Sequence, residues 1–197
     1  MAKTIHEDQL HKIFDNVNNW LKFAEAKNLG LLTVNSAIIF GVSKFGNSPD
    51  VLSSYSYWVL TFFLIMSSLV CLSSLMPVLE LSNLDSETGK LISQFNEIFK
   101  KEIPEPKDDE KNIYYYGHIK FCDGNKFEKI FIKKTSTIIS LSDSDKDLVA
   151  QITMNSRISW TKYSFFKTAS YLTLMGIFLS IFTIALIFFF KHFCFCI

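Results

Sequence analysis

The sequence has no marked excess of charge of either sign and few cysteines. Its 20 Lys and Arg residues against 19 Asp and Glu residues give a formal net charge of +1, so no basic surplus indicates nucleic-acid binding. Cys71, Cys122, Cys194 and Cys196 form no Cys-x-x-Cys pair or His/Cys cluster, so we expect no metal site. The N-terminal MAKTIHEDQLHK lacks the apolar core of a signal peptide, so we expect no cleavage there.

Residue patterns typical of catalytic sites are also missing. No glycine-rich phosphate-binding loop is present, and DGNK, residues 123–126, is interpreted as a turn. Asp108, Asp109 and Glu110 are clustered, but together with Lys111 they belong to a charged, proline-marked loop that we expect to be solvated. We therefore expect no enzymatic activity and no cofactor.

Apolar residues, by contrast, make up 49% of the chain, which includes 20 Phe. Three stretches read as membrane-spanning helices, although 29–45 is short for a hydrocarbon core of about 30 Å. We predict an all-α membrane protein with a small cytoplasmic, mainly helical module inserted between the second and third spans. The predicted order is a cytoplasmic amphipathic helix (1–28), a first transmembrane helix (29–45), an external link (46–55), a second transmembrane helix (56–79), the cytoplasmic module (80–168), a third transmembrane helix (169–190) and a short tail (191–197).

Basic residues gather before the first and third predicted spans, namely Lys22, Lys27, Arg157, Lys162 and Lys167. The connection between the first two spans, 43–55, has only Lys44, and the tail has only Lys191. Because short basic segments resist translocation, we expect the N-terminus and the module of this multi-pass protein to be cytoplasmic.

An apolar stripe precedes the first predicted span. Its members recur at steps of three and four and are Leu10, Ile13, Phe14, Val17, Trp20, Leu21 and Ala24. We interpret the stripe as the face of a helix packed on the soluble module. The alternative is a helix lying on the membrane surface, which the mixed charges of its other face make less suitable.

Three segments of the module have readable patterns. A helix is expected at 86–101, and 113–121 (IYYYGHIKF) reads as a short extended piece that ends at a turn. Residues 126–134 (KFEKIFIKK) fit both a strand alternation and a helical stripe, so the residues alone leave them ambiguous.

The last helix is predicted to be long. Ser144 and Asp147 form a capping box, so we expect the helix to start near Asp145. No Pro or Gly interrupts the chain from Asp145 until Gly176, which predicts one helix from the module into the membrane. One face mixes polar and apolar residues and reads as an interface; it carries Leu148, Ile152, Asn155, Ser159, Lys162 and Phe166.

The order of these features resembles the Pycsar effector transmembrane family. The matching stretches are the amphipathic helix running into KNLGLLTVNSAII (27–39), the link and second span, YYGHI (115–119), and QITMNSRISWTKYSFFKTA (151–169) before the last span. The resemblance favours a helix at 126–134. It implies an antiphage effector that senses a cyclic nucleotide made by a separate cyclase and compromises the inner membrane of the infected cell. No separate nucleotide-binding domain fits in this chain, and no catalytic residues carry over from the family.

Four residues of the module are candidate contacts for a nucleotide. Arg157 and Lys162 could meet a phosphate, although the favoured interpretation is that they hold the third span's entry on the cytoplasmic side. His118 could stack on a base together with Tyr116, although core packing of the tyrosine is the simpler interpretation.

Polar residues inside the predicted spans are candidates for helix packing or for lining a pore. Asn35 lies beside Ser36 in the first span, and Ser67 and Ser74 lie in the second. Because a lipid-facing amide is unfavourable, Asn35 should face another span of this chain or of a neighbouring copy.

We therefore predict an effector that forms a homo-oligomer in the lipid bilayer and permeabilises it on a cyclic-nucleotide signal, causing growth arrest or death. The alternative is a non-signalling anchor or assembly subunit of a larger complex. A third hypothesis is a membrane-bound nucleotide-processing enzyme.

Overall fold

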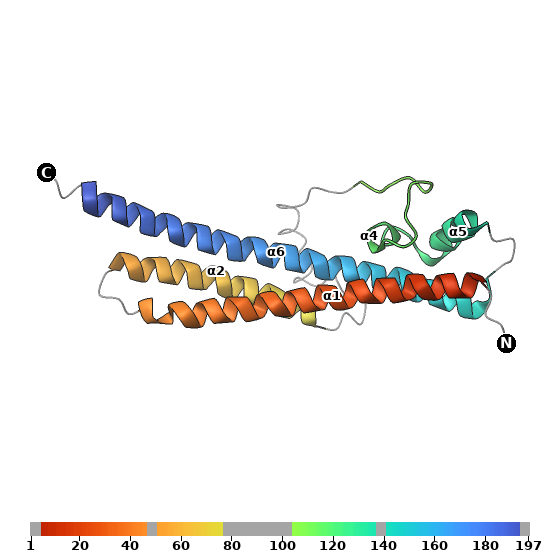
Figure 1. Ribbon diagram of the computed structural model, residues 1–197, viewed down its shortest axis with the longest axis horizontal. Helices are drawn as coiled ribbons and strands as arrows, with labels where there is room; N and C mark the ends of the chain where they lie inside the picture. The colour runs from red at the N-terminus through yellow and green to blue at the C-terminus, as the bar shows by residue number, and fades with distance from the viewer. Residues whose placement is uncertain (1–4, 47–50, 77–103, 137–140, 194–197) are drawn as a thin grey trace. The chain divides into compact units, whose positions relative to one another are not determined.

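The computed structural model describes residues 5–46, 51–76, 104–136 and 141–193, and its regular elements there are all helices. They are α1 (Ile5–Val42), the 3-10 turn η1 (Ser43–Phe45), α2 (Val51–Leu75), α4 (Tyr116–Ile119), α5 (Gly124–Thr135) and α6 (Asp143–Phe193) (Figure 1). The all-α prediction is confirmed for this part of the chain. The helix predicted at 86–101 lies outside the described residues.

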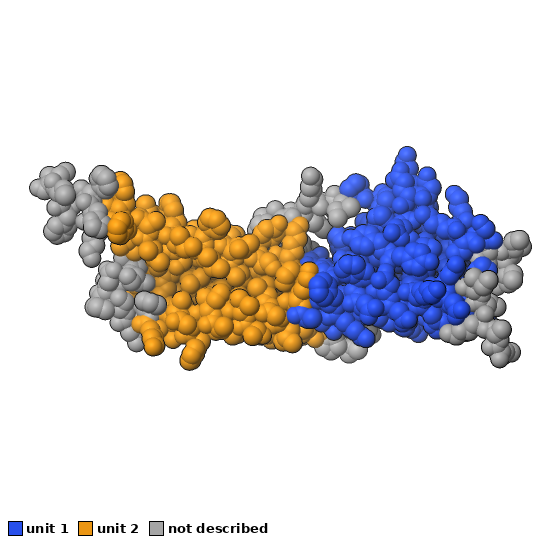
Figure 2. Space-filling model, in the orientation of Figure 1, with its two compact units in different colours: residues 1–26, 78–164 blue, residues 27–77, 165–197 orange. Residues whose placement is uncertain are grey.

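The chain divides into two compact units, coloured separately in Figure 2. Unit 1 comprises residues 1–26 and 78–164, and unit 2 comprises residues 27–77 and 165–197. Both α1 and α6 contribute residues to each unit.

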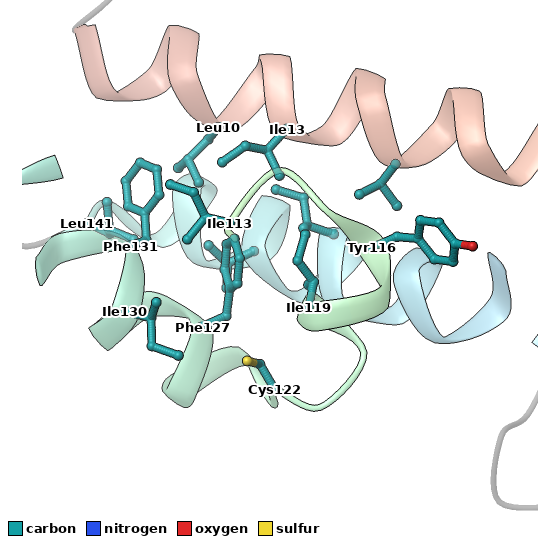
Figure 3. Packing of buried hydrophobic residues seen from close by; sticks show 13 residues of the cluster. Leu10, Ile13, Ile113, Tyr116, Ile119, Cys122, Phe127, Ile130, Phe131 and Leu141 are labelled. Atoms are coloured by element: carbon teal, nitrogen blue, oxygen red, sulfur yellow. The ribbon is translucent and has the colours of Figure 1, made fainter. Parts of the chain in front are cut away.

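Unit 1 has a hydrophobic core built by four segments. Leu10 and Ile13 point from α1 toward residues of the shorter helices and of the loop before α4 (Figure 3). The full cluster is Leu10, Ile13, Val17, Ile113, Tyr116, Ile119, Cys122, Phe127, Ile130, Phe131, Leu141, Val149 and Ile152. Full burial of one such aliphatic or aromatic side chain contributes about 1.5–3 kcal/mol, so the cluster is the main source of stability in this unit.

The apolar stripe of α1 packs into this core, as the favoured interpretation predicted. Leu10, Ile13 and Val17 are fully buried, while Lys12 and Asn19 on the opposite face are exposed. Because the stripe is covered by protein, it is not available to a membrane surface.

The prediction of an extended piece at 113–121 is wrong. Residues Tyr116–Ile119 form the one-turn helix α4, whose inner side carries Tyr116 and Ile119 into the core. The DGNK stretch is a helix start rather than a turn, because the Asp123 side chain accepts a hydrogen bond from the backbone N–H of Lys126, as an N-cap does. The ambiguous 126–134 segment lies in α5 and is therefore helical.

The last helix is continuous, but it begins two residues before the predicted start. The capping box is formed by Ser142 and Asp145: the Asp145 N–H donates to Ser142 Oγ at 3.2 Å, and the Ser142 N–H donates to Asp145 Oδ2 at 3.1 Å. Helix α6 then runs through Gly176 without a break to Phe193.

Of the three predicted spans, the second and third qualify by length and composition, and the first does not. Among the described residues two helices are long and apolar enough to cross a membrane, by length and composition: Ser54–Leu75 in α2 and Asp143–Phe189 in α6. In α1 the α-helix ends at Val42, so the apolar stretch 29–42 rises only about 21 Å, against a core of about 30 Å. The residues just before it include Glu25 and Lys27, so the stretch cannot be lengthened in that direction.

Candidate functional site

A buried ring of polar side chains joins three helices inside unit 2. Asn35 of α1 is fully buried, and its Nδ2 donates to Ser67 Oγ of α2 at 2.8 Å. Thr173 Oγ1 of α6 donates to Asn35 Oδ1 at 3.0 Å, and it lies 2.9 Å from Ser67 Oγ. We call Asn35, Ser67 and Thr173 the polar ring.

The polar ring satisfies its own hydrogen bonds. Ser67 Oγ also lies 2.8 Å from the carbonyl oxygen of Ala169, so its single proton is donated either there or to Thr173. Each member thus has a hydrogen-bond partner in unit 2, so the amide of Asn35 is stabilised within one chain. Asn35 thus faces two other helices of its own chain.

The other polar residues predicted for these helices lie elsewhere. Ser36 is exposed, and its hydroxyl donates to the carbonyl of Leu32 one turn earlier, so it makes no contact with another helix through that proton. Ser74 is buried in α2. Thr173 was not predicted, because Ser170, Ser180 and Thr183 carry hydroxyls in the same stretch and nothing in the sequence singles Thr173 out.

Close packing of α2 on α6 depends on Gly176. A Cβ placed on this glycine would lie 2.7 Å from Cβ of Phe63, too close for two carbon atoms. Small residues allow such backbone approach in membrane helices, where packing rather than water exclusion holds helices together. The outer sides of these helices carry large exposed apolar side chains, such as Trp58, Phe62 and Phe178.

In unit 1, α1 and α6 meet along a polar seam. Asn155 Nδ2 donates to Asn18 Oδ1 at 2.8 Å, and Lys162 Nζ pairs with Glu25 Oε1 at 2.8 Å. The two contacts are seven residues apart on each helix, so the helices run parallel with the heptad spacing of a coiled coil. The mixed face predicted on the last helix is thus an interface within the chain. Lys162, a candidate phosphate contact, has its ammonium group in this seam.

The guanidinium of Arg157 is also used inside unit 1. It donates from Nη2 to the carbonyl oxygen of Cys122 at 3.0 Å, which ties α6 to the loop before α5. One turn further along α6, the ammonium group of Lys120 lies over the ring of Trp160 in a cation–π contact, 3.0 Å from the ring centroid. Both contacts hold the short helices of unit 1 to α6.

Tyr116 is part of an aromatic cluster rather than an open stacking platform. Its ring stacks on Tyr163 with centroids 5.4 Å apart and lies 5.3 Å from Trp20. Burial raises the pKa of both tyrosines. The imidazole of His118 accepts a hydrogen bond at Nδ1 from the backbone N–H of Asn112 at 2.9 Å. Each of the four candidates therefore has a contact within unit 1. That any of them binds a nucleotide stays a prediction.

The expectation that Lys111 is solvated is wrong. Its side chain is only 2% exposed, and Nζ pairs with Glu105 Oε1 at 2.6 Å and Asp108 Oδ1 at 2.8 Å. Burial alone would lower the pKa of Lys111, but the hydrogen bonds to the two carboxylates outweigh it and raise that pKa. The same hydrogen bonds lower the pKa of Glu105 and of Asp108. The two carboxylates thus stabilise a buried cation in a loop that sequence alone marked as open.

Within the described residues, no group of three or more His, Cys, Asp and Glu side chains could hold a metal ion. Comparison with protein families shows a match to the Pycsar effector protein domain over residues 9–189. Neither the search of curated proteins nor the search of solved structures gives a match. The matched region includes the polar ring, the parallel seam and all of α4 and α5.

Proposed function

The chain belongs to the Pycsar effector protein family, and on this premise we propose that it is an antiphage effector that permeabilises the inner membrane of an infected cell in response to a cyclic nucleotide. The observation that carries the proposal is the family match, which covers nearly the whole chain. The cyclic nucleotide is made by a separate cyclase, and the outcome for the cell is growth arrest or death.

A membrane location is supported by the surface of unit 2. Two helices have the length and composition of spans, and many of their large apolar side chains are exposed, Phe178 to 75%. Exposed apolar area on this scale is rare in soluble monomers and is what lipid tails cover in a bilayer. We place unit 2 in the bilayer and unit 1 in the cytoplasm, in keeping with the basic residues Lys22 and Arg157 of unit 1. In this arrangement the short apolar part of α1 that belongs to unit 2 crosses beside α2 and α6.

Self-association is the second part of the proposal. Because the polar ring is satisfied within one chain, copies would associate through the exposed apolar sides of α2 and α6. A conducting path would then require the ring to open and turn its amide and hydroxyls toward water. Shifting such an equilibrium from 1:99 to 99:1 takes about 5.5 kcal/mol of differential ligand affinity, which several sites in an oligomer supply more readily than one.

The test is dye release from liposomes that carry the purified full chain. Each 3′,5′-cyclic mononucleotide and a panel of cyclic oligonucleotides is titrated while leakage, ligand binding and ligand hydrolysis are followed. We expect leakage only with the cognate nucleotide, with a sigmoidal dose response and no consumption of the ligand.

Other outcomes would point to other functions. Leakage that is equal with and without every nucleotide would overturn gating by this chain and favour an anchor or assembly subunit. Turnover of the nucleotide would instead identify an enzyme.

A further inference from the structure

Helix α5 carries four lysines outside the face that packs into the core of unit 1. Phe127, Ile130 and Phe131 hold one side of the helix in the core. Lys126, Lys129, Lys133 and Lys134 recur at steps of one, three and four, so they gather on one side of the helix. These four lysines line one cavity.

The cavity has a volume of about 320 Å³, at the lower end of the range for small-molecule sites. Asp108 and Asp109 also line it, and Ile130 supplies an apolar wall. A site with several cations, two carboxylates and one apolar surface can bind an anion that also carries hydroxyl or amino groups.

The positive charge in the cavity is only partly compensated. Lys126 Nζ pairs with Glu105 Oε1 at 2.8 Å and lies 3.6 Å from Asp108 Oδ1, and Lys134 donates to the backbone carbonyl of Lys111. The ammonium groups of Lys129 and Lys133 make no ion pair or hydrogen bond with any residue that the structure describes. They are exposed and lie one helical turn apart, a separation at which two long side chains can reach one anion.

We propose that the α5 cavity binds the phosphate group of a small anionic ligand between the ammonium groups of Lys129 and Lys133. Asp109, which is exposed and lines the same cavity, accepts a hydrogen bond from a hydroxyl or amino group of that ligand. The volume admits one mononucleotide-sized molecule. Only the identification of the phosphate as that of a cyclic nucleotide rests on the proposed function; a lipid headgroup offers the same chemistry.

The test uses the full chain in nanodiscs of phosphatidylcholine, titrated with the four 3′,5′-cyclic mononucleotides. The cavity variant is Lys129→Gln/Lys133→Gln, and Lys129→Arg/Lys133→Arg keeps the charge. The matched control is Lys12→Gln/Lys22→Gln, which removes the same charge from exposed positions of α1 in unit 1. Circular dichroism verifies that each variant is folded.

A second arm tests the lipid source. Hydrogen exchange of α5 is compared in nanodiscs of phosphatidylcholine alone and with phosphatidylglycerol added, for the wild type and the same variants.

We expect the Gln variant to weaken binding of one nucleotide about tenfold or more, while the Arg variant and the control bind like the wild type. If α5 is protected from exchange only when phosphatidylglycerol is present, and only the Gln variant loses this protection, the site binds a lipid phosphate. If, in addition, no nucleotide binds to the wild type, the proposed response to a nucleotide is refuted. Nucleotide binding that is equal in the wild type and the Gln variant would overturn the site while leaving the proposed function standing. If the Gln variant changes neither binding nor protection, the proposal is wrong.

Discussion

At the residue scale, Lys111 and Thr173 are two side chains whose importance depends on where they are buried. Lys111 comes from a loop of charged residues, yet its stem is covered and its ammonium group meets two carboxylates. Thr173 comes from an apolar helix, yet its hydroxyl completes the polar ring. In both cases, removing the hydrogen bond leaves its partner group unpaired, which lowers the stability of the fold.

We predict that Lys111→Ala destabilises unit 1 by about 2 kcal/mol, because it removes a buried stem and the cation that holds Glu105 and Asp108 together. Lys107→Ala, at an exposed position of the same loop, should change the stability by less than about 0.5 kcal/mol. Thermal unfolding followed by circular dichroism measures both. Equal melting temperatures for the two variants would contradict a structural role for Lys111.

The same cluster predicts a dependence on acid. The folded-state pKa values of Glu105 and Asp108 are lowered, so their stabilising effect is fully present above the unfolded values of about 4.3 and 3.9. It is lost as the pH falls through the folded values. We therefore expect the melting temperature to fall below about pH 4, and to fall less steeply in Glu105→Gln/Asp108→Asn. Parallel pH profiles for the wild type and this double variant would refute the assignment.

For the polar ring, we predict that Thr173→Val costs about 1 kcal/mol, since valine keeps the shape of the side chain but removes the donor to Asn35. Thr183→Val is the matched control on the same helix, because Thr183 is only partly buried and its hydroxyl donates to the carbonyl of Leu179 in its own helix. Unfolding in mild detergent compares the two. If Thr183→Val loses as much stability as Thr173→Val, the hydrogen bonds of the polar ring make no specific contribution to stability.

At the element scale, the patterns that could be read from the sequence were those set by local chemistry. The lack of Gly and Pro from Asp145 to Gly176 correctly predicted an unbroken α6, and the 3.6-residue periodicity of the stripe correctly predicted the packed face of α1. The capping box was misplaced because Ser142 and Ser144 offer the same hydroxyl, and only the geometry shows which one pairs with a carboxylate.

Other features could not be predicted because they depend on contacts between residues far apart in the sequence. Residues 113–121 have β-prone aromatics, but burial of Tyr116 against Trp20 and Tyr163 overrides that preference and favours the turn α4. The hydrogen-bond partners of Asn35 are Ser67 and Thr173, which lie far from it in the sequence. The sequence therefore predicted that Asn35 has a partner but did not identify the partner. The α5 cavity could not be predicted for the same reason.

The two membrane-type helices depend on one glycine for their contact. We predict that Gly176→Ala destabilises the packing of α2 on α6 in unit 2, because the added Cβ meets Cβ of Phe63 at 2.7 Å. Gly30→Ala is the matched control: a Cβ there meets nothing within 4 Å, so the variant should be neutral or stabilised by up to about 1 kcal/mol. Resistance to proteolysis in detergent distinguishes them. Two variants of equal resistance would argue against close helix packing at Gly176.

At the scale of the whole molecule, the proposed orientation puts unit 1 in the cytoplasm and the end of the chain outside. Cys122 is a poor reporter of this orientation because it is 1% exposed, and burial also raises the pKa of its thiol. Lys107 lies at an exposed position of unit 1 and can carry a substitute thiol.

We predict that Lys107→Cys is protected from an impermeant thiol reagent in intact cells, whereas Cys194 and Cys196 react. Permeabilised cells, in which the Lys107→Cys thiol should become reactive, are the control. If Lys107→Cys is labelled in intact cells, unit 1 lies outside and the proposed orientation is wrong.

The polar ring also imposes an order of events on biosynthesis. Asn35 and Thr173 are 138 residues apart. At a ribosomal rate of about 5–20 residues per second, the amide of Asn35 waits roughly 7–28 seconds for the hydroxyl of Thr173 to be made. During that interval the nascent chain carries an incompletely paired amide, and a chain truncated before α6 carries it permanently. The hydrogen bonds of the polar ring can therefore be completed only after this part of α6 has been synthesised.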